Sequence, residues 1–376
     1  MPLTTKPPFR ADHVGSLLRP PELKAAIEGR QQGKVSAEAL RAIEDRCIRE
    51  VVKLQEETGI PVVTDGEFRR YEFHTPILTK IQGVELTGRV EFHFHYEDQD
   101  IEYAPPVLEV TGKLGHPPGG LTVEDFKFTK QLTDRTVKIC LPSPTYMYAR
   151  GGWAGINKKI YPDKDALIDG LAKVYNAELH ALWNAGCNFV QIDDTNFAHI
   201  CDPKFQGRYR KIGEDPDALP SFYAKMINAC IKDRPAGQIV GIHMCRGNVR
   251  GAWVAEGGYE PVAEALLGEM NMDCYFMEYD TPRAGDFSPL RHLRGKDKLV
   301  VLGLITSKKP QLESPDDLKR RIDEAARFVP LEQLALSPQC GFGSLYQGNP
   351  VTEADERRKL RLVVDVAKSV WGDARC

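Results

Sequence analysis

The chain has 376 residues, of which 42% are hydrophobic and 27% are charged, a composition typical of a folded globular protein. Its 50 basic and 53 acidic residues nearly balance, so no long-range field favours nucleic acid or an anionic membrane as a partner. Neither a run of about 18 apolar residues nor an N-terminal hydrophobic segment is present, so we expect a cytoplasmic protein without a transmembrane helix or signal peptide.

Short apolar segments alternate with amphipathic ones along most of the chain. Strands are predicted near 11–15, 61–65, 137–141, 188–193, 238–243, 274–279, 299–305 and 334–338. Helical periodicity and end signals predict helices over about 36–58, 164–185, 220–232, 259–270, 314–329 and 352–370. Eight strand-containing units favour an α/β fold, a (β/α)8 TIM barrel that spans residues 1–376 as a single domain. A doubly wound sheet is less favoured, because no glycine-rich phosphate loop follows the first strand.

Residues from about 83 to 130 interrupt this alternation. Alternating side chains over 90–96 and turn signals at Gly112 and 117–120 predict an inserted β-hairpin region. His93 and His95 form a His-x-His pair there, but alternation along a half-exposed strand explains the pair without a metal.

The nine cysteines are an odd number, spread along a chain too long to need disulfide bonds. Most are therefore expected to be reduced and to pack as small hydrophobic side chains. Cys245 and Cys340 differ from the rest: the first belongs to a His-x-Cys pattern at a strand end, and the second lies in a Gln-Cys-Gly turn with no evident core role.

A metal site is predicted from residues that follow three of the strands. His243 and Cys245 are two residues apart, so they point to the same side of the pleat and can reach one ion. Glu278 ends an apolar run, and Cys340 follows the last strand; a barrel brings such strand ends together at one face. Two thiolates, an imidazole and a carboxylate form a tetrahedral zinc set in which the weaker oxygen ligand can be displaced.

Other polar residues fall at the same face of the predicted barrel. Those at strand ends are Ser16, Asp65, Glu67, Asp193 and Asp194. Basic residues that could meet an acidic group of a substrate, or simply be solvated, are Arg69, Arg70, Arg208 and Lys308. Asn248 and the segment 256–259 indicate a loop shaped for close backbone approach, or a tight turn before a helix.

These motifs resemble the cobalamin-independent methionine synthase family, in its catalytic C-terminal domain, which shares the barrel of the uroporphyrinogen decarboxylase superfamily. The resemblance rests on the His-x-Cys, the downstream Glu and the late Cys-Gly, and it extends to residues 12–16, 64–67, 191–194 and 337–341 in family order. It implies that the zinc ligands are His243, Cys245, Glu278 and Cys340. It also implies that Ser16, Glu67 and Asp193 hold the amino and carboxyl groups of a thiol substrate, with Asp193 taking the ammonium.

Two departures from full-length synthases point to the short members of that family. The chain has no room for the additional N-terminal barrel that helps to bind a polyglutamylated folate. The loop after the seventh strand carries Lys308 where those enzymes have a His thought to act as an acid, so Lys308 is a candidate for proton transfer. The short relatives include epoxyalkane:coenzyme M transferases, which the insertion also resembles.

The leading hypothesis is thus a zinc-dependent methyl or alkyl transferase that forms a thioether from a zinc-activated thiol, most simply by methyl transfer to homocysteine. Its catalytic residues would be Asp193, Glu67 and Lys308, and its partners a small-molecule thiol and a methyl or alkyl donor; a homo-oligomer is also possible. The alternatives are an epoxide-opening thiol transferase, a zinc lyase or decarboxylase of the wider superfamily, which would not need Cys245 and Cys340, and a non-catalytic zinc- or thiol-binding protein.

Overall fold

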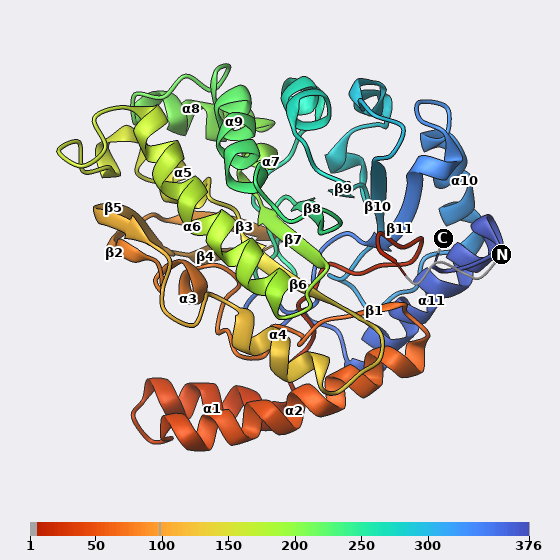
Figure 1. The fold of residues 1–376 in the computed structure, drawn as a ribbon. Coiled ribbons are helices and arrows are strands. Elements are labelled where there is room, and N and C mark those ends of the chain that lie inside the picture. The colour runs from red at the N-terminus through yellow and green to blue at the C-terminus, as the bar shows by residue number, and fades with distance from the viewer. Residues whose placement is uncertain (1–5, 98, 376) are drawn as a thin grey trace.

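A computed structural model describes residues 6–97 and 99–375. Its centre is one curled sheet of seven parallel strands in the order β1-β6-β7-β8-β9-β10-β11 (Figure 1). The strands are β1 (Val62–Val63), β6 (Thr136–Pro142), β7 (Phe189–Asp194), β8 (Ile239–Met244), β9 (Cys274–Glu278), β10 (Leu299–Ile305) and β11 (Leu334–Pro338). Every residue of β7 and β10 is buried, because helices and loops cover both faces of the parallel sheet.

The long helices are mostly where the sequence predicts them. They are α2 (Ala37–Thr58), α6 (Lys164–Asn184), α9 (Leu219–Ile231), α10 (Pro315–Ala325) and α11 (Glu353–Trp371). Their ends obey the expected chemistry: the Ser36 side chain accepts a hydrogen bond from the Ala39 backbone, and Thr352 and Asp355 form a capping box. The helix predicted over 259–270 is instead a 3₁₀ turn, Glu260–Val262, followed by a π-helix, Glu264–Glu269.

The predicted first strand, over 11–15, is not formed as a strand. Ala11 makes a single parallel bridge to Leu336 of β11, and the Leu17 amide then donates to the Gly66 carbonyl beyond β1. Gly15, with φ of +137°, ends the extended run. The segment therefore spans from β11 to the end of β1 without forming a ladder with either strand.

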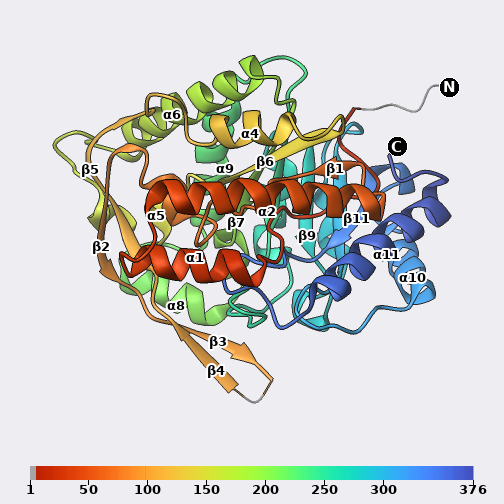
Figure 2. The same ribbon diagram turned by 90° about the horizontal axis from the view of Figure 1, so that it is seen from below.

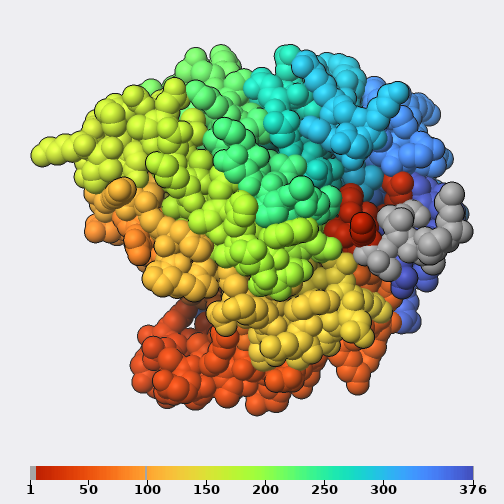
Figure 3. Space-filling view, in the orientation of Figure 1, coloured from red at the N-terminus to blue at the C-terminus, as the bar shows by residue number. Residues whose placement is uncertain are grey.

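The insertion consists of two hairpins. An outer pair joins β2 (Gln82–Arg89) to β5 (Pro106–Gly115), and an inner pair joins β3 (Phe92–Tyr96) to β4 (Gln99–Tyr103). The β3–β4 hairpin lies beside α8 (Pro203–Lys211) in Figure 2. On the surface in Figure 3, the orange outer hairpin borders the yellow-green segment of α5 (Tyr146–Ala149) and α6.

Several short helices complete the chain. The hairpin interpretation is wrong for the end of the insertion, where the structure has α4 (Val123–Lys130), and α1 (Pro21–Gln31) was not expected. The remaining α-helices are α3 (Thr75–Leu78) and α7 (Asn196–Ile200). None of the described helices is both long and apolar enough to cross a membrane.

Candidate active site

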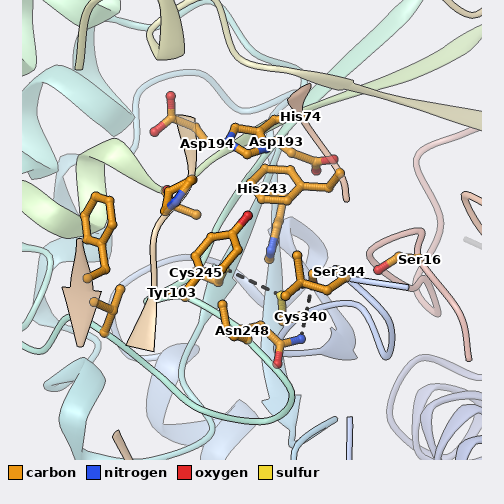
Figure 4. Close-up of a pocket in the computed structure, with 18 of the residues that line it drawn as sticks. Ser16, His74, Tyr103, Asp193, Asp194, His243, Cys245, Asn248, Cys340 and Ser344 are labelled. Carbon is orange, nitrogen blue, oxygen red and sulfur yellow. Dashed lines mark hydrogen bonds between the residues drawn. The ribbon is translucent and has the colours of Figure 1, made fainter. Parts of the chain in front are cut away.

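The main pocket lies at the carboxyl ends of the central strands, as expected for a sheet of this type. Polar groups from β7, from β8 and from the loops after β1 and β11 face it, and the β3–β4 hairpin contributes an aromatic wall (Figure 4). Two clusters of polar side chains meet in this pocket.

The thiol cluster consists of His243, Cys245 and Cys340. One ligand atom from each lies within 4.8 Å of the others, and all three residues are buried. The two Sγ atoms are 3.5 Å apart (Figure 4), and neither ring nitrogen of His243 has a hydrogen-bond partner among the described residues. Burying polar atoms without hydrogen-bond partners is costly, so the two ring nitrogens of His243 favour a ligand at this cluster.

Local geometry explains how Cys340 reaches β8. Gly341 follows it, and a Cβ at this position would lie 1.9 Å from the Ser16 Oγ atom. The Phe342 amide donates to the Ser16 carbonyl at 2.8 Å, which holds the two loops together. Only a glycine permits this approach, which brings Cys340 and Ser16 to the same side of the pocket.

The protonation of the thiol cluster is shared among its members. The hydrogen bond between the two thiols lowers the pKa of Cys340 well below its usual value and raises that of Cys245 well above it. Burial alone would lower the pKa of His243, but the neighbouring Cys340, with Asp193 and Glu278, raises it. One thiol of the pair thus ionises readily, which favours a cation between these side chains.

Glu278 lies at the end of β9, fully buried, but it is outside the three-residue cluster. Its carboxylate accepts a hydrogen bond from the Arg246 amide at 2.7 Å and one from the Arg283 side chain at 3.4 Å. Burial raises the pKa of Glu278, but Lys308 and Arg246 outweigh this and lower it overall, so the carboxylate is ionised. Its electrostatic interaction with both His243 and Cys245 shows that it belongs to the same neighbourhood.

The carboxylate cluster consists of Glu67, Cys140 and Asp193, with one ligand atom from each within 4.8 Å of the others. Burial raises the pKa of Glu67 to about 7 and that of Asp193 to about 6. The Gln191 amide donates to Asp193 at 2.7 Å, whereas Glu67 Oε2 has no hydrogen-bond partner among the described residues. Two buried carboxyl groups with raised pKa values favour a cationic ligand between them.

Backbone strain supports this interpretation of Glu67. Its φ is +60°, a conformation that non-glycine residues rarely adopt, and its amide donates to the Asp65 carboxylate at 2.9 Å. The neighbouring Arg70 lies 3.7 Å from the Glu67 carboxylate and donates to the Cys140 carbonyl at 2.7 Å. The strain thus accompanies a carboxyl group that lines the pocket.

The other residues singled out in the sequence have varied positions. Lys308 is buried, but it does not line the pocket; its amino group donates to the Gly247 carbonyl at 2.8 Å. Arg69 pairs with Asp45 at 2.6 Å and with Asp125 at 2.8 Å, away from the pocket lining. Asn248 lines the pocket and donates to the Gly341 carbonyl at 2.7 Å.

The loop over 256–259 makes the close approach expected of it. A Cβ on Gly257 would lie 2.4 Å from the Cys201 carbonyl oxygen, and the Arg246 side chain donates to the Gly257 carbonyl at 2.5 Å. His95 of the predicted histidine pair contacts Asp100 at 2.6 Å, and neither it nor His93 belongs to a possible metal group among the described residues.

Sequence reasoning missed a polar group on the hairpin side of the pocket. His74 and His199 line it, and the Arg150 side chain lies 2.7 Å from the His74 ring nitrogen. Burial lowers the pKa of both histidines, that of His199 to about 3, so both are neutral. None of these three residues is the end of a central strand, so strand-end reasoning had no signal for them.

Together, these features define an α/β protein with a curled parallel sheet, in which a buried group of two thiols and an imidazole lines the same pocket as two buried carboxyl groups. The family described as "Cobalamin-independent synthase, Catalytic domain" matches residues 9–369, and the chain belongs to that family.

Relatives of similar length agree with this family. The chain is 44% identical to the uncharacterized protein YxjH of Bacillus subtilis, over 97% of this chain and 96% of the relative. A solved structure described as a putative vitamin-B12 independent methionine synthase from Listeria monocytogenes has a TM-score of 0.78 and 36% identity, and the match covers 98% of this chain and 99% of that one. The chain is also 24% identical to a methionine synthase of Pyrococcus abyssi, over 95% of this chain and 90% of the relative.

Proposed function

We propose that the protein is a zinc-dependent transferase that moves a methyl group onto a thiol, with homocysteine as the thiol. The observation that carries the proposal is the buried thiol cluster, whose ligand atoms lie within 4.8 Å of one another, in the pocket that the carboxylate cluster also lines. Homologues named methionine synthase support the choice of reaction. We further propose that residues 11–15 take the place of an eighth strand, so that the curled sheet is a complete barrel.

The side chains present fit a zinc ion. His243, Cys245 and Cys340 offer an imidazole and two thiols, the ligand types that zinc prefers, and the imidazole nitrogens have no other partner among the described residues. Glu278 would be the fourth ligand, since it is buried, ionised and interacts electrostatically with two of the other three. The chemistry such an ion supplies is a lower pKa for a bound thiol, so that a thiolate is available at neutral pH.

The carboxylate cluster would bind the other end of the thiol substrate. Asp193 and Glu67 would take the ammonium, whose charge lowers the pKa of both carboxyl groups when it binds. Ser16 lines the same pocket and would contact the amino or carboxyl group of the substrate. This grip fixes the sulfur relative to the thiol cluster, so that the incoming methyl group meets it in one orientation.

Lys308 would act through charge. Its ammonium group lowers the pKa of Glu278 and of Cys340, and its bond to the Gly247 carbonyl keeps it in place. We propose that it keeps the ligand set ionised and supplies a proton when the reaction needs one.

The methyl donor is proposed by analogy: a Thermotoga petrophila protein, 24% identical, is named 5-methyltetrahydropteroyltriglutamate--homocysteine methyltransferase, but this chain spans only 44% of its length. Folate, methylcobalamin and other methylated molecules are thus donors to compare.

The test is metal analysis followed by a donor panel. Purified protein is expected to contain about one zinc per chain and to form methionine from homocysteine with one donor of the panel. Absence of zinc after purification and reconstitution would overturn zinc dependence. Thioether formation only from an epoxide would favour the coenzyme M transferase-like alternative, and thiol binding without turnover of any donor would favour a binding protein. No feature of the pocket favours either alternative over methyl transfer.

A further inference from the structure

A second pocket adjoins the main one on its hairpin side. It lies between β3, α5 and α8. Four residues line both pockets and form the boundary between them: Phe92, Tyr146, Arg150 and His199. A molecule that extends from the thiol cluster past this boundary would therefore enter the second pocket.

The lining of the second pocket carries positive charge with no carboxylate to balance it. Arg150, Arg208 and Lys211 contribute three cations, and no Asp or Glu is among the lining residues. Within the described part of the chain, none of the three makes an ion pair, although the molecule has many ion pairs elsewhere. Uncompensated cations that face one hollow favour an anion there.

The two arginines are held so that they remain available to a ligand. The Arg150 side chain donates to the Pro106 carbonyl at 2.8 Å and lies against His74, while Arg208 donates to the Glu91 carbonyl at 3.1 Å. Both guanidinium groups pack on the ring of Phe92, at 6.0 Å and 4.4 Å from its centroid. Burial lowers the pKa of each arginine and of the adjacent His199, and the charge of Arg150 lowers the pKa of the other two further. Glu72, which is outside the pocket lining, offsets part of this effect at Arg150.

We propose that the second pocket binds the anionic end of the methyl or alkyl donor, a carboxylate or a phosphate carried on an apolar body. This assignment rests on the proposed function, because it is the transferase reaction that requires a second substrate beside the thiol. The apolar body would pass the aromatic boundary formed by Phe92 and Tyr146, and the anionic group would lie between Arg150 and Arg208. The donor is thereby oriented with its reactive carbon toward the thiol cluster.

Direct binding tests the site without any assumption about catalysis. The probes are benzoate, phenyl phosphate and neutral benzamide, measured by ligand-observed NMR on the zinc-containing protein. At least one anionic probe is expected to bind about tenfold more tightly than benzamide, since a charge-assisted hydrogen bond contributes that much or more. Preference for phenyl phosphate would indicate a phosphate-bearing donor, and preference for benzoate a carboxylate. Equal binding of all three probes, or no binding, would overturn the proposal.

A matched pair of variants on α8 separates the site from general charge. Arg208→Gln removes a lining cation, whereas Arg210→Gln removes an exposed one from the same helix that does not line the pocket. The anion preference is expected to disappear in Arg208→Gln and to persist in Arg210→Gln, with circular dichroism confirming that both are folded. Equal loss in both variants would overturn the site.

Thioether formation is measured in the same preparations, so that failure of the anion site can be told apart from failure of the proposed function. Transferase activity without an Arg208-dependent anion site overturns the inference and leaves the function intact. Conversely, an Arg208-dependent anion site in a protein that transfers no methyl or alkyl group overturns the proposed function, and with it the assignment of the pocket to a donor.

Discussion

The thiol cluster and the carboxylate cluster line one pocket but have opposite chemistry. The first combines two thiols with an imidazole, on β8 and just after β8 and β11, while the second has two carboxyl groups, after β1 and on β7. In the first cluster, the hydrogen bond between the two thiols has the largest effect: it lowers the pKa of Cys340 and raises that of Cys245. Burial dominates the second, where both carboxyl pKa values rise. The proposed roles, metal binding for the first cluster and ammonium binding for the second, should therefore be separable by mutation.

The largest effect is expected from the thiol cluster. Cys340→Ser removes one ligand from the set and should lower zinc affinity by about 100-fold or more, since a structural or catalytic zinc set contributes more than 10 kcal/mol in total. Metal content after dialysis against a weak chelator, with methionine formation, measures the change. Cys187→Ser is the matched control: this buried thiol donates to the Phe189 carbonyl and is outside the thiol cluster, so zinc should be retained. Unchanged zinc in Cys340→Ser would remove it from the ligand set.

A smaller effect, of a different kind, is expected from the carboxylate cluster. Asp193→Asn keeps the shape of the side chain but removes the charge that would pair with the substrate ammonium. Loss of a buried charge pair costs about 3 kcal/mol, so kcat/KM for homocysteine should fall about 100-fold. The zinc content should not change. If Asp193→Asn loses zinc as Cys340→Ser does, the two clusters are one functional unit and the comparison fails.

The pH profile sharpens the comparison further. The carboxyl groups of Glu67 and Asp193, with pKa values of about 7 and about 6, must lose their protons before they can pair with an ammonium. The kcat/KM for homocysteine, which reports the free protein, should therefore rise with pH through a midpoint near 7 and level off above about pH 8. Glu67→Gln removes the carboxyl group with the higher pKa, so the midpoint should move down toward about 6.

The Glu67→Gln variant also shows whether the carboxylate cluster or the thiol cluster controls the pH dependence of kcat/KM. Glu67→Gln should lower kcat/KM about tenfold at pH 8, where the lost charge matters most. A profile that keeps its midpoint in Glu67→Gln would mean that another group, such as a thiol, controls it.

Sequence reasoning located most of the sheet for a physical reason. Buried parallel strands are continuous apolar runs, so seven of the eight predicted strands are present, and their ends contain His243, Glu278 and Asp193. The predicted first strand failed because Ala11 alone makes the bridge to β11. The long helices were recognisable from their caps, whereas periodicity alone could not distinguish the π-helix over 264–269 from an α-helix.

The hairpin side of the pocket was harder to predict than its strand ends. The position of an insertion relative to a sheet depends on tertiary packing, not on strand order, so His74 and Arg150 carried no signal. Arg208 was predicted to meet an acidic group of a substrate or to be solvated, and the sequence could not decide between the two because its contact with Phe92 of β3 joins segments far apart in the chain.

The smallest predicted effect concerns the support beneath Asp193. Gln191 donates to Asp193 at 2.7 Å and to the Val14 carbonyl at 2.6 Å, and its own oxygen accepts from the buried Lys138 at 2.8 Å. The Lys138 ammonium can only donate hydrogen bonds, so it fixes the oxygen end of the Gln191 amide and keeps the donor end toward Asp193. Gln191→Glu removes that donor and places a second carboxylate there, which raises the pKa of Asp193.

The consequence is a pH-dependent defect. At pH 7, kcat/KM for homocysteine should fall by less than about tenfold, and the difference from the parent should shrink at pH 8.5, because about one pKa unit separates the two proteins. Zinc content should stay the same, since Gln191 is not part of the thiol cluster. A defect equally large at both pH values would contradict this. It would show that Gln191 acts by packing, which holds the Asp193 side chain in position, and not through the pKa of Asp193.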